Sequence, residues 1–196
     1  HTDGRLAVGV VGDANSGPIT VTAPISPANV AALSLVTPGV IADTYTAGTD
    51  VAVANLSTSG NLSPGTSPGI FSVVGNHTIA AGSTFTVEIG GATPGHGAGF
   101  HDQLSASGTV DIGSGVTLST VAAGGFVPSP GQSFVIIART GGSGTFDGLA
   151  EGAQVSANFL GSGLPARISY VGGTGDDVVI TVVSVDYTVT TTGNAI

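Results

Sequence analysis

Residues 177–192, DVVITVVSVDYTVTTT, run for sixteen positions without a Gly or a Pro. At about 3.3 Å per residue in an extended strand, such a stretch spans on the order of 50 Å, which is far longer than an ordinary strand. Its apolar residues lie on both faces in the first half and then alternate with polar ones, at Val178, Val179, Ile180, Val182, Val183, Val185, Tyr187 and Val189. A strand that is apolar on both faces needs packing partners on both sides. We therefore expect a long C-terminal strand that either closes its own domain or completes that of a neighbour.

The rest of the chain consists of short apolar runs separated by turn residues. Runs rich in Val, Ile, Thr and Phe predict strands at residues 6–11, 19–23, 50–56, 70–74, 83–89, 105–112, 116–121, 133–138, 154–159 and 167–171. In the clearest of them, Phe85, Val87 and Ile89 alternate with polar residues, which indicates a half-buried strand. Pro-Gly pairs between the runs are typical of tight turns. The pattern predicts an all-β fold, either a β-solenoid or a β-sandwich of short strands with Gly and Pro turns.

One segment could be helical instead, and the sequence also suggests three regions. Ser26 can cap a helix, Pro27 suits its first position and residues 28–35 can supply its turns, although their apolar residues suit a strand nearly as well. We expect an N-terminal β segment at 1–57 that forms an assembly arm or a small subdomain. A domain of repeated strands follows at 58–183, and a C-terminal strand or tail occupies 184–196.

Charge is scarce along the whole chain. Charged residues make up 8% of it and the net charge is −9, with no Lys among its basic residues. Nucleic acid is therefore not expected as a partner, because phosphate binding needs clustered cations. Membrane insertion is not expected either, since no apolar run reaches the ~20 residues of a membrane helix. A β surface with so few charges favours self-association.

The composition and the first residue indicate an exported protein. The chain has no Cys, Met or Trp, which excludes disulfides and Cys-based zinc sites. It begins at His1, and we expect a form from which a signal peptide has been removed, located outside the cell or on its surface. Asn-x-Ser/Thr triplets make Asn55, Asn61 and Asn76 candidate glycosylation sites.

Several runs of sequence carry a resemblance to a known family. They are GNLSPGTSPGIFSV (60–73), STFTVEIGG (83–91), DQL (102–104), GTVDI (108–112), PGQSF (130–134), GTFDGLAEG (144–152) and ISYVGGTGDDVV (168–179). Over about residues 59–183 the chain resembles the autotransporter-associated β-strand-repeat proteins of bacterial surfaces. The resemblance implies a secreted, β-rich passenger or adhesin-like segment, usually a right-handed β-helix without catalytic residues.

Two patterns are candidates for metal binding. Residues 172–180, GGTGDDVVI, fit a calcium-binding nonapeptide with Asp176 and Asp177 as carboxylate ligands, but calcium in such arrays lies between successive copies and only one copy is present. His96 and His101 flank a Gly-rich loop and could chelate a transition metal if the loop folds back. The competing interpretations are a Gly turn and a loop with solvent-exposed imidazoles. We expect no cofactor, with calcium as the alternative.

Signatures of an enzyme are weak. Residues 65–69, GTSPG, match a nucleophile elbow, but Pro68 has no N–H to offer the oxyanion hole after Ser67. His1 with His77 or His101 could form the copper brace of lytic polysaccharide monooxygenases, although the chain has no Trp to present to a sugar chain. No pair of carboxylates stands in contexts that a glycosidase requires. The sequence therefore predicts a protein that is not an enzyme.

These observations together favour a structural role. We expect a secreted subunit of an extracellular filament, sheath or surface matrix, with further copies of itself as partners. Residues 177–192, or the strand at 6–11, would add to an open sheet edge of the next copy, and such a head-to-tail contact makes a fibre. The alternative is a monomeric adhesin or carbohydrate-binding surface module, with Phe100, Tyr45 and Tyr170 as the candidate contact residues.

Overall fold

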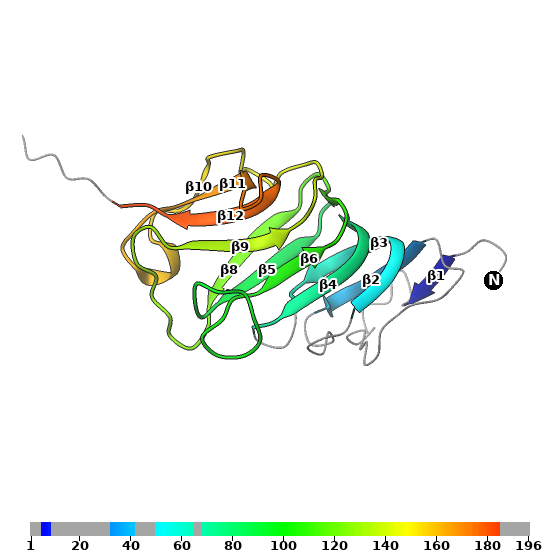
Figure 1. Ribbon diagram of the computed structural model, residues 1–196, viewed down its shortest axis with the longest axis horizontal. Helices are drawn as coiled ribbons and strands as arrows, with labels where there is room; N and C mark the ends of the chain where they lie inside the picture. The colour runs from blue at the N-terminus through cyan, green and yellow to red at the C-terminus, as the bar shows by residue number, and fades with distance from the viewer. Residues whose placement is uncertain (1–4, 9–31, 42–49, 65–67, 185–196) are drawn as a thin grey trace, which may run out of the picture.

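The computed structural model describes residues 5–8, 32–41, 50–64 and 68–184, with side chains from Leu56 onward (Figure 1). It is all-β, with one short 3-10 helix, η1, in the described part. The strands are β1 (Arg5–Val8), β2 (Ala32–Ile41), β3 (Asp50–Leu62), β4 (Ile70–Ile79), β5 (Thr84–Ile89), β6 (Gln103–Ala106), β7 (Val110–Ile112), β8 (Thr117–Ala122), β9 (Ser133–Ala138), β10 (Gln154–Ser156), β11 (Ala166–Gly172) and β12 (Asp177–Val182), and η1 is Phe159–Gly161. They form one curled mixed sheet.

Parallel pairing at a constant sequence spacing organises the middle of the chain. Each residue in these ladders pairs with one 33 positions later, as Phe71 does with Leu104 and Leu104 with Ile137. The pairs β4–β7 and β5–β8 keep the same spacing. The polypeptide therefore returns to the same place after every 33 residues, and each return adds a strand beside the previous one.

The strands before Ile70 continue the parallel pairing with shorter returns. β1 pairs with β2, β2 with β3, and β3 with both β4 and β5. The strand predictions at 6–11 and 50–56 overlap β1 and β3, whereas the prediction at 19–23 lies outside the described residues. The helix expected at 28–35 is wrong for residues 32–35, which belong to β2, because pairing with β3 overrides local helix propensity. Residues 28–31 lie outside the description.

The sheet changes to antiparallel pairing at its C-terminal end. β12 lies between β9 and β11, and β10 pairs with β11 at the outside. The expected continuous strand over 177–192 is wrong, because β12 ends at Val182 and the next two residues are not strand. Its partners end there: Thr181 pairs with Ser133, the first residue of β9, and Val182 pairs with Ala166, the first residue of β11. Pro165 precedes β11 and has no N–H to donate.

The core is built from the inner face of the curled sheet. Phe85, Val87 and Ile89 are fully buried, which confirms the alternation predicted for residues 83–89. The Phe85 ring stacks on Phe146 with centroids 5.8 Å apart. The prediction of a strand over 154–159 holds for residues 154–156 only, because the chain turns into η1 at Phe159, which is also fully buried.

Two glycines allow successive returns of the chain to approach closely. A Cβ placed on Gly142 would overlap the carbonyl oxygen of Val110, and one on Gly144 would overlap that of Ile112. Both glycines also have positive φ, at 140° and 82°, where L-residues with a Cβ are strained. Their position lets Gly141 and Ser143 accept hydrogen bonds from Val110 and Ile112 N–H.

Candidate functional site

The strand predicted to drive assembly lies inside the sheet of its own chain. Val178, Ile180 and Val182 are fully buried and Val179 nearly so, with β9 and β11 on the two sides of β12. Val183 follows the strand and donates its N–H to Pro165 O at 2.9 Å. Val185, Tyr187 and Val189 lie outside the described residues. Residues 178–182 therefore complete their own domain, so only the positions after them are left to reach a neighbour.

A different strand, β8, offers an open edge. Among the described residues its only strand partner is β5. Beside the start of β8, Asp147 N–H donates to Val116 O at 2.7 Å, but the next described pairing of that part of the chain is between β10 and β11. The return that would place a further strand beside β8 is thus absent from the described part of the chain. Sequence reasoning found a strand at 116–121 but gave no sign that it ends a ladder.

Neighbouring strands are joined on the outer faces of the sheet by small polar side chains. Thr84 and Thr117 hydroxyls lie 3.0 Å apart, and Ser133 and Thr181 hydroxyls 2.9 Å apart. Thr86 donates its hydroxyl hydrogen to Asn61 Oδ1 at 2.9 Å. These three ties between neighbouring strands use uncharged side chains, which agrees with the low charge of the sequence.

Gln103 fastens β6 to β9, and His101 is buried just before β6 with carbonyl oxygens near both ring nitrogens. His101 is fully buried, with Nδ1 3.0 Å from Gly91 O and Nε2 3.3 Å from Val135 O. Burial lowers the pKa of His101, an effect that the contacts with backbone carbonyls oppose. A neutral imidazole carries one N–H, so it can donate to only one of these two carbonyl oxygens. Gln103 Nε2 also donates to Val135 O, at 2.8 Å.

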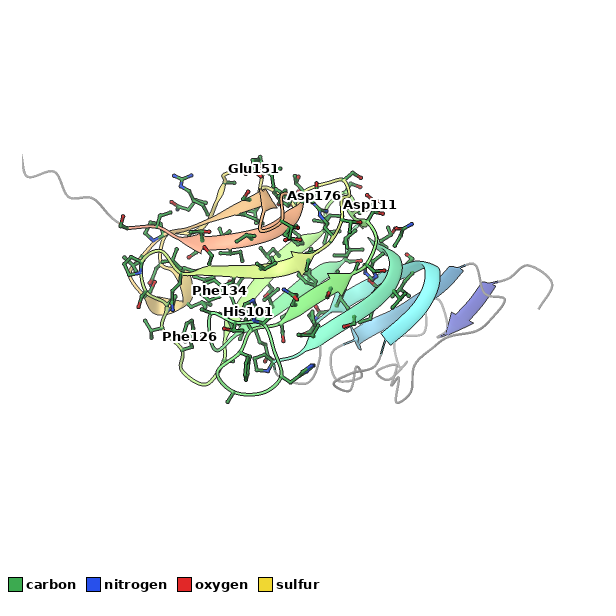
Figure 2. All side chains as sticks on the ribbon, in the orientation of Figure 1. His101, Asp111, Phe126, Phe134, Glu151 and Asp176 are labelled. Atoms are coloured by element: carbon green, nitrogen blue, oxygen red, sulfur yellow. The ribbon has the colours of Figure 1, made fainter. Side chains whose placement is uncertain are left out.

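His101 lies at one end of an aromatic cluster. Its ring meets Phe134 edge to face at 5.6 Å, and Phe134 contacts Phe126 and Phe159 at 6.1 and 6.0 Å. Figure 2 shows His101, Phe126 and Phe134 together on one side of the molecule, away from Asp111, Asp176 and Glu151. The imidazole is therefore part of a packed aromatic group.

Asp102 binds backbone from two earlier segments. Its Oδ1 accepts the Gly69 N–H at 2.7 Å and its Oδ2 accepts the Glu88 N–H at 2.8 Å, while the side chain is fully buried. Burial raises the pKa of Asp102 to about 7, and the two N–H donors act in the opposite direction. Because Gly69 precedes Asp102 by 33 residues, this carboxyl group joins one return of the chain to the next.

His96 and His101, the weak metal-binding candidates of the sequence, lie in different environments. His96 is exposed, whereas His101 is buried with both ring nitrogens near carbonyl oxygens. No group of three or more His, Cys, Asp or Glu side chains in the described part of the chain could hold a metal ion. For the copper brace, His1 lies outside the description and His77 is fully buried in the core. Ser67 of the elbow motif also lies outside it.

Of the two candidate calcium ligands, Asp177 bonds to its own chain through its carboxylate, whereas Asp176 is exposed. Asp177 Oδ1 accepts the Arg139 N–H at 2.9 Å, and Oδ2 accepts the Thr174 N–H and hydroxyl at 2.8 and 3.1 Å. Arg139 Nε donates to Asp176 O at 2.7 Å and Nη1 donates to Val110 O at 2.6 Å. Burial lowers the pKa of Arg139, against the neighbouring carboxylates. Both oxygens of Asp177 are thus occupied by protein donors, so the motif here is a closed turn before β12.

His77 is a second buried polar group, and it lies in the core. Its Nε2 is 3.1 Å from the Thr58 hydroxyl, and its Nδ1 has no hydrogen-bond partner. The ring meets Phe71 edge to face at 5.7 Å. Burial lowers the pKa of His77 from 6.5 to about 3. This histidine is therefore neutral over the physiological pH range.

The remaining sequence candidates are dispersed. Phe100 is exposed on the loop between β5 and β6, while Tyr170 is buried and donates its hydroxyl hydrogen to Leu149 O at 2.7 Å. The side chains of Tyr45 and Asn55 lie outside the described residues. Asn61 and Asn76 are described, and Asn76 is exposed with its Oδ1 accepting the Thr109 N–H at 3.0 Å. Because Tyr170 is buried, it does not share an exposed surface with Phe100.

Comparison with known proteins gives no match with any family model, curated protein or solved structure. Within the described part of the chain, no helix is long and apolar enough to cross a membrane.

Proposed function

We propose that this chain is a non-enzymatic structural subunit of an extracellular filament, sheath or surface matrix. Its architecture in this proposal is a β-solenoid, as the family resemblance implies, and its copies join head to tail by strand addition. The observation that carries the proposal is the parallel ladder with its constant 33-residue return, which leaves a strand edge open where the returns stop. A sheet edge is a template for another chain.

The bonding between returns supports the solenoid part of the proposal. Asp102 to Gly69, Thr84 to Thr117, and Asn76 to Thr109 each join residues 33 positions apart. Three bonds of different chemistry, one buried and two exposed, thus keep the same spacing. A β-sandwich has no reason to keep one spacing at all three places, whereas successive turns of a solenoid require it.

The use of polar groups supports a structural rather than a catalytic role. Asp102, His101 and Asp177 are the buried groups that sequence or pKa would select as reactive. The oxygens of Asp102 and Asp177 each accept a donor of the same chain, and both nitrogens of His101 face carbonyl oxygens. Asp102 bonds to Gly69 and Asp177 bonds to Arg139, which are distant in sequence, as expected for groups that hold a scaffold together.

The second candidate function is a monomeric adhesin or carbohydrate-binding module, and Phe100 is the observation in its favour. The ring is 38% exposed, and it packs on Gly95, where a Cβ would overlap it. A fixed, accessible aromatic ring can stack on a sugar. Retention of the monomer on polysaccharide gels, lost in Phe100→Ala, would favour this function over assembly.

Electron microscopy of the full chain tests the structural role. Uniform filaments or sheets are expected, and deletion of residues 184–196 should abolish them while circular dichroism shows an unchanged β signal. Dispersed particles at every protein concentration would contradict the proposal. If filaments still form after the deletion, the added strand would instead be the N-terminal strand β1, which has one strand partner among the described elements.

A further inference from the structure

We propose that the acceptor edge in this assembly is β8, and that its occupant is residues 185–192 of a second copy. This inference rests on the proposed function and names the surface through which it operates. Four properties support the pairing: the free backbone groups of β8, the exposed core beside it, the lack of any protection of this edge and the alternation of the incoming segment.

The backbone of β8 has one satisfied side and one free side. Thr117 donates its N–H to Ser83 O and Ala123 donates to Ile89 O, both at 2.9 Å, so the odd-numbered residues of this strand bond to β5. By the alternation of a parallel ladder, the N–H and C=O groups of Leu118, Thr120 and Ala122 point away from β5. No described residue forms a strand ladder with them. They are the groups that an added strand would bond.

The core is uncovered beside the same strand. Leu118, Thr120 and Ala122 pair with Phe85, Val87 and Ile89, which are fully buried, and therefore lie on the inner face of the sheet. Yet Ala122 is exposed and the other two are only partly buried. Nearby in sequence, Val127 is 60% exposed. An incoming strand with an apolar inner face would bury this wall as β8 buries that of β5.

The edge at β8 lacks the features that protect edges in other proteins. Its sequence, TLSTVA, has no charged residue and no Pro, and its register with β5 is unbroken over six residues. The edge strand β10 differs, because it has three residues and an irregular register, and Arg167 from the adjacent β11 donates to Gly152 O just before it. Short, irregular and charged edges resist strand addition. The edge at β10 is thus protected against strand addition, and the edge at β8 is not.

The sequence of residues 185–192 matches what β8 requires. Val185, Tyr187 and Val189 alternate with Asp186 and threonines, which is the pattern of a half-buried strand. Its apolar positions would continue the inner face of Leu118, and its threonines would continue the outer row of Thr84 and Thr117. A one-residue shift would place the polar positions on the core, so the alternation also sets the register.

The connection from β12 favours a second copy over the same molecule. Val182 is fixed to Gln132 by its N–H at 2.9 Å, and Val183 still pairs with Pro165. Figure 1 shows β12 pointing out of the body of the sheet at this end. Within one molecule, η1 lies beside β8, so a returning tail would have to pass it. A strand from another molecule must also fit beside η1, but it does not have to start from the fixed position of Val183.

Cysteine pairing in the full chain tests the arrangement, because the natural sequence has no Cys. In the first set of mixtures, Thr120→Cys is combined with a chain that carries one cysteine at position 185, 187 or 189. In the second set, it is combined with a chain that carries one cysteine at position 186 or 188. Same-face neighbours on paired strands have Cβ atoms about 4.5–5.5 Å apart, within reach of a disulfide. Covalent heterodimers are expected with the first set and not with the second.

A proline at the free edge provides an independent test. Thr120→Pro removes an N–H that does not bond to β5 and blocks the incoming strand, whereas Thr120→Val keeps the N–H and serves as the matched control. We expect assembly of Thr120→Pro to be weaker by about tenfold or more, with an unchanged thermal midpoint of the monomer and with Thr120→Val assembling like the parent.

The outcomes separate the two levels of the proposal. Filaments with no link to position 120, and full assembly of Thr120→Pro, would overturn the choice of β8 and leave the structural role standing. Links that form within a chain carrying both Thr120→Cys and a cysteine at position 187, but not between two singly substituted chains, would overturn the intermolecular occupant. Absence of self-association in the parent chain would overturn both the proposed function and this inference.

Discussion

Replacing His77 by Leu should change stability in a strongly pH-dependent way. His77 is 1% exposed and neutral in the folded protein, where burial lowers its pKa to about 3. The unfolded chain instead takes up a proton on this ring near pH 6.5. Because the folded pKa is the lower one, acidification favours the unfolded state, and stability is lost as the pH falls from about 6.5 toward 3.

The magnitude follows from the two pKa values. At pH 7.5 both states carry a neutral ring, whereas at pH 5.0 protonation of the unfolded chain costs the wild type about 2 kcal/mol of stability. The variant has no such term. At pH 7.5 His77→Leu loses the contact with Thr58 but also removes the unpartnered Nδ1, and these changes offset each other within about 1 kcal/mol. The variant should therefore gain about 2 kcal/mol relative to wild type between pH 7.5 and 5.0.

The free energy of unfolding must be compared between variant and wild type, because other titrating groups raise or lower stability over the same pH range. Burial raises the pKa of Asp102 to about 7, so the folded protein binds that proton first, which adds stability as the pH falls from about 7 to 4. His101, whose pKa is lowered by burial, acts in the same direction as His77. The profile of the wild type alone can thus be nearly flat.

Urea unfolding at pH 7.5 and 5.0 measures the effect, at protein concentrations where only monomers sediment. His96→Leu provides the control, because it removes a histidine that is exposed and does not belong to the core. The double variant Thr58→Val/His77→Leu should have the same pH dependence as His77→Leu, with no orphaned hydroxyl. A difference between His77→Leu and wild type that stays constant within about 0.5 kcal/mol across the two pH values would refute the assignment of His77 as a buried neutral ring.

Three further substitutions test the packing and the turn before β12. Gly144→Ala should cost about 1–3 kcal/mol more than Gly148→Ala in urea unfolding, because both have positive φ but only the Cβ at 144 overlaps Ile112 O; equal costs would argue against a close approach of the two returns. Phe85→Ala should destabilise by about 3–5 kcal/mol, and a loss below about 1 kcal/mol would mean that this ring is not in the core. Asp177→Ala should lower stability by about 2 kcal/mol or more, and the thermal midpoint of the parent chain should be the same in calcium and in chelator. A calcium-dependent rise of several degrees in the parent that is absent from Asp177→Ala would show that the oxygens of Asp177 bind the ion.

Local patterns in the sequence predicted the strands well because they depend on neighbouring residues only. The alternation of Phe85, Val87 and Ile89 follows directly from which side chains one face of the sheet buries. The turns follow from Pro and Gly, whose backbone preferences need no tertiary partner. The same reasoning failed for residues 32–35, where a parallel partner in β3 determined the outcome.

The return of 33 residues could not be read from any single strand. It depends on loops of different length that bring Phe71, Leu104 and Ile137 into one column. A weak signal exists, because the runs TFT at 84–86 and TLS at 117–119 have the same pattern at this spacing. The end of β12 was also hidden, since it depends on where its two partners begin and not on its own sequence.

Stability and assembly should therefore respond to different residues in this chain. Asp102, Arg139 and His77 have their bonds and contacts inside one molecule, so their substitution should change the free energy of unfolding and leave the length of filaments at a given monomer concentration unchanged. The free groups of β8 form no described ladder in the monomer, so blocking them costs the isolated fold little. Such a division is expected of a protein whose successive returns are bonded to one another within the molecule and whose unpaired strand edges lie at the ends. Because strand addition uses the same backbone bonds that join β5 to β8, the contact between copies would resemble one more return of the chain.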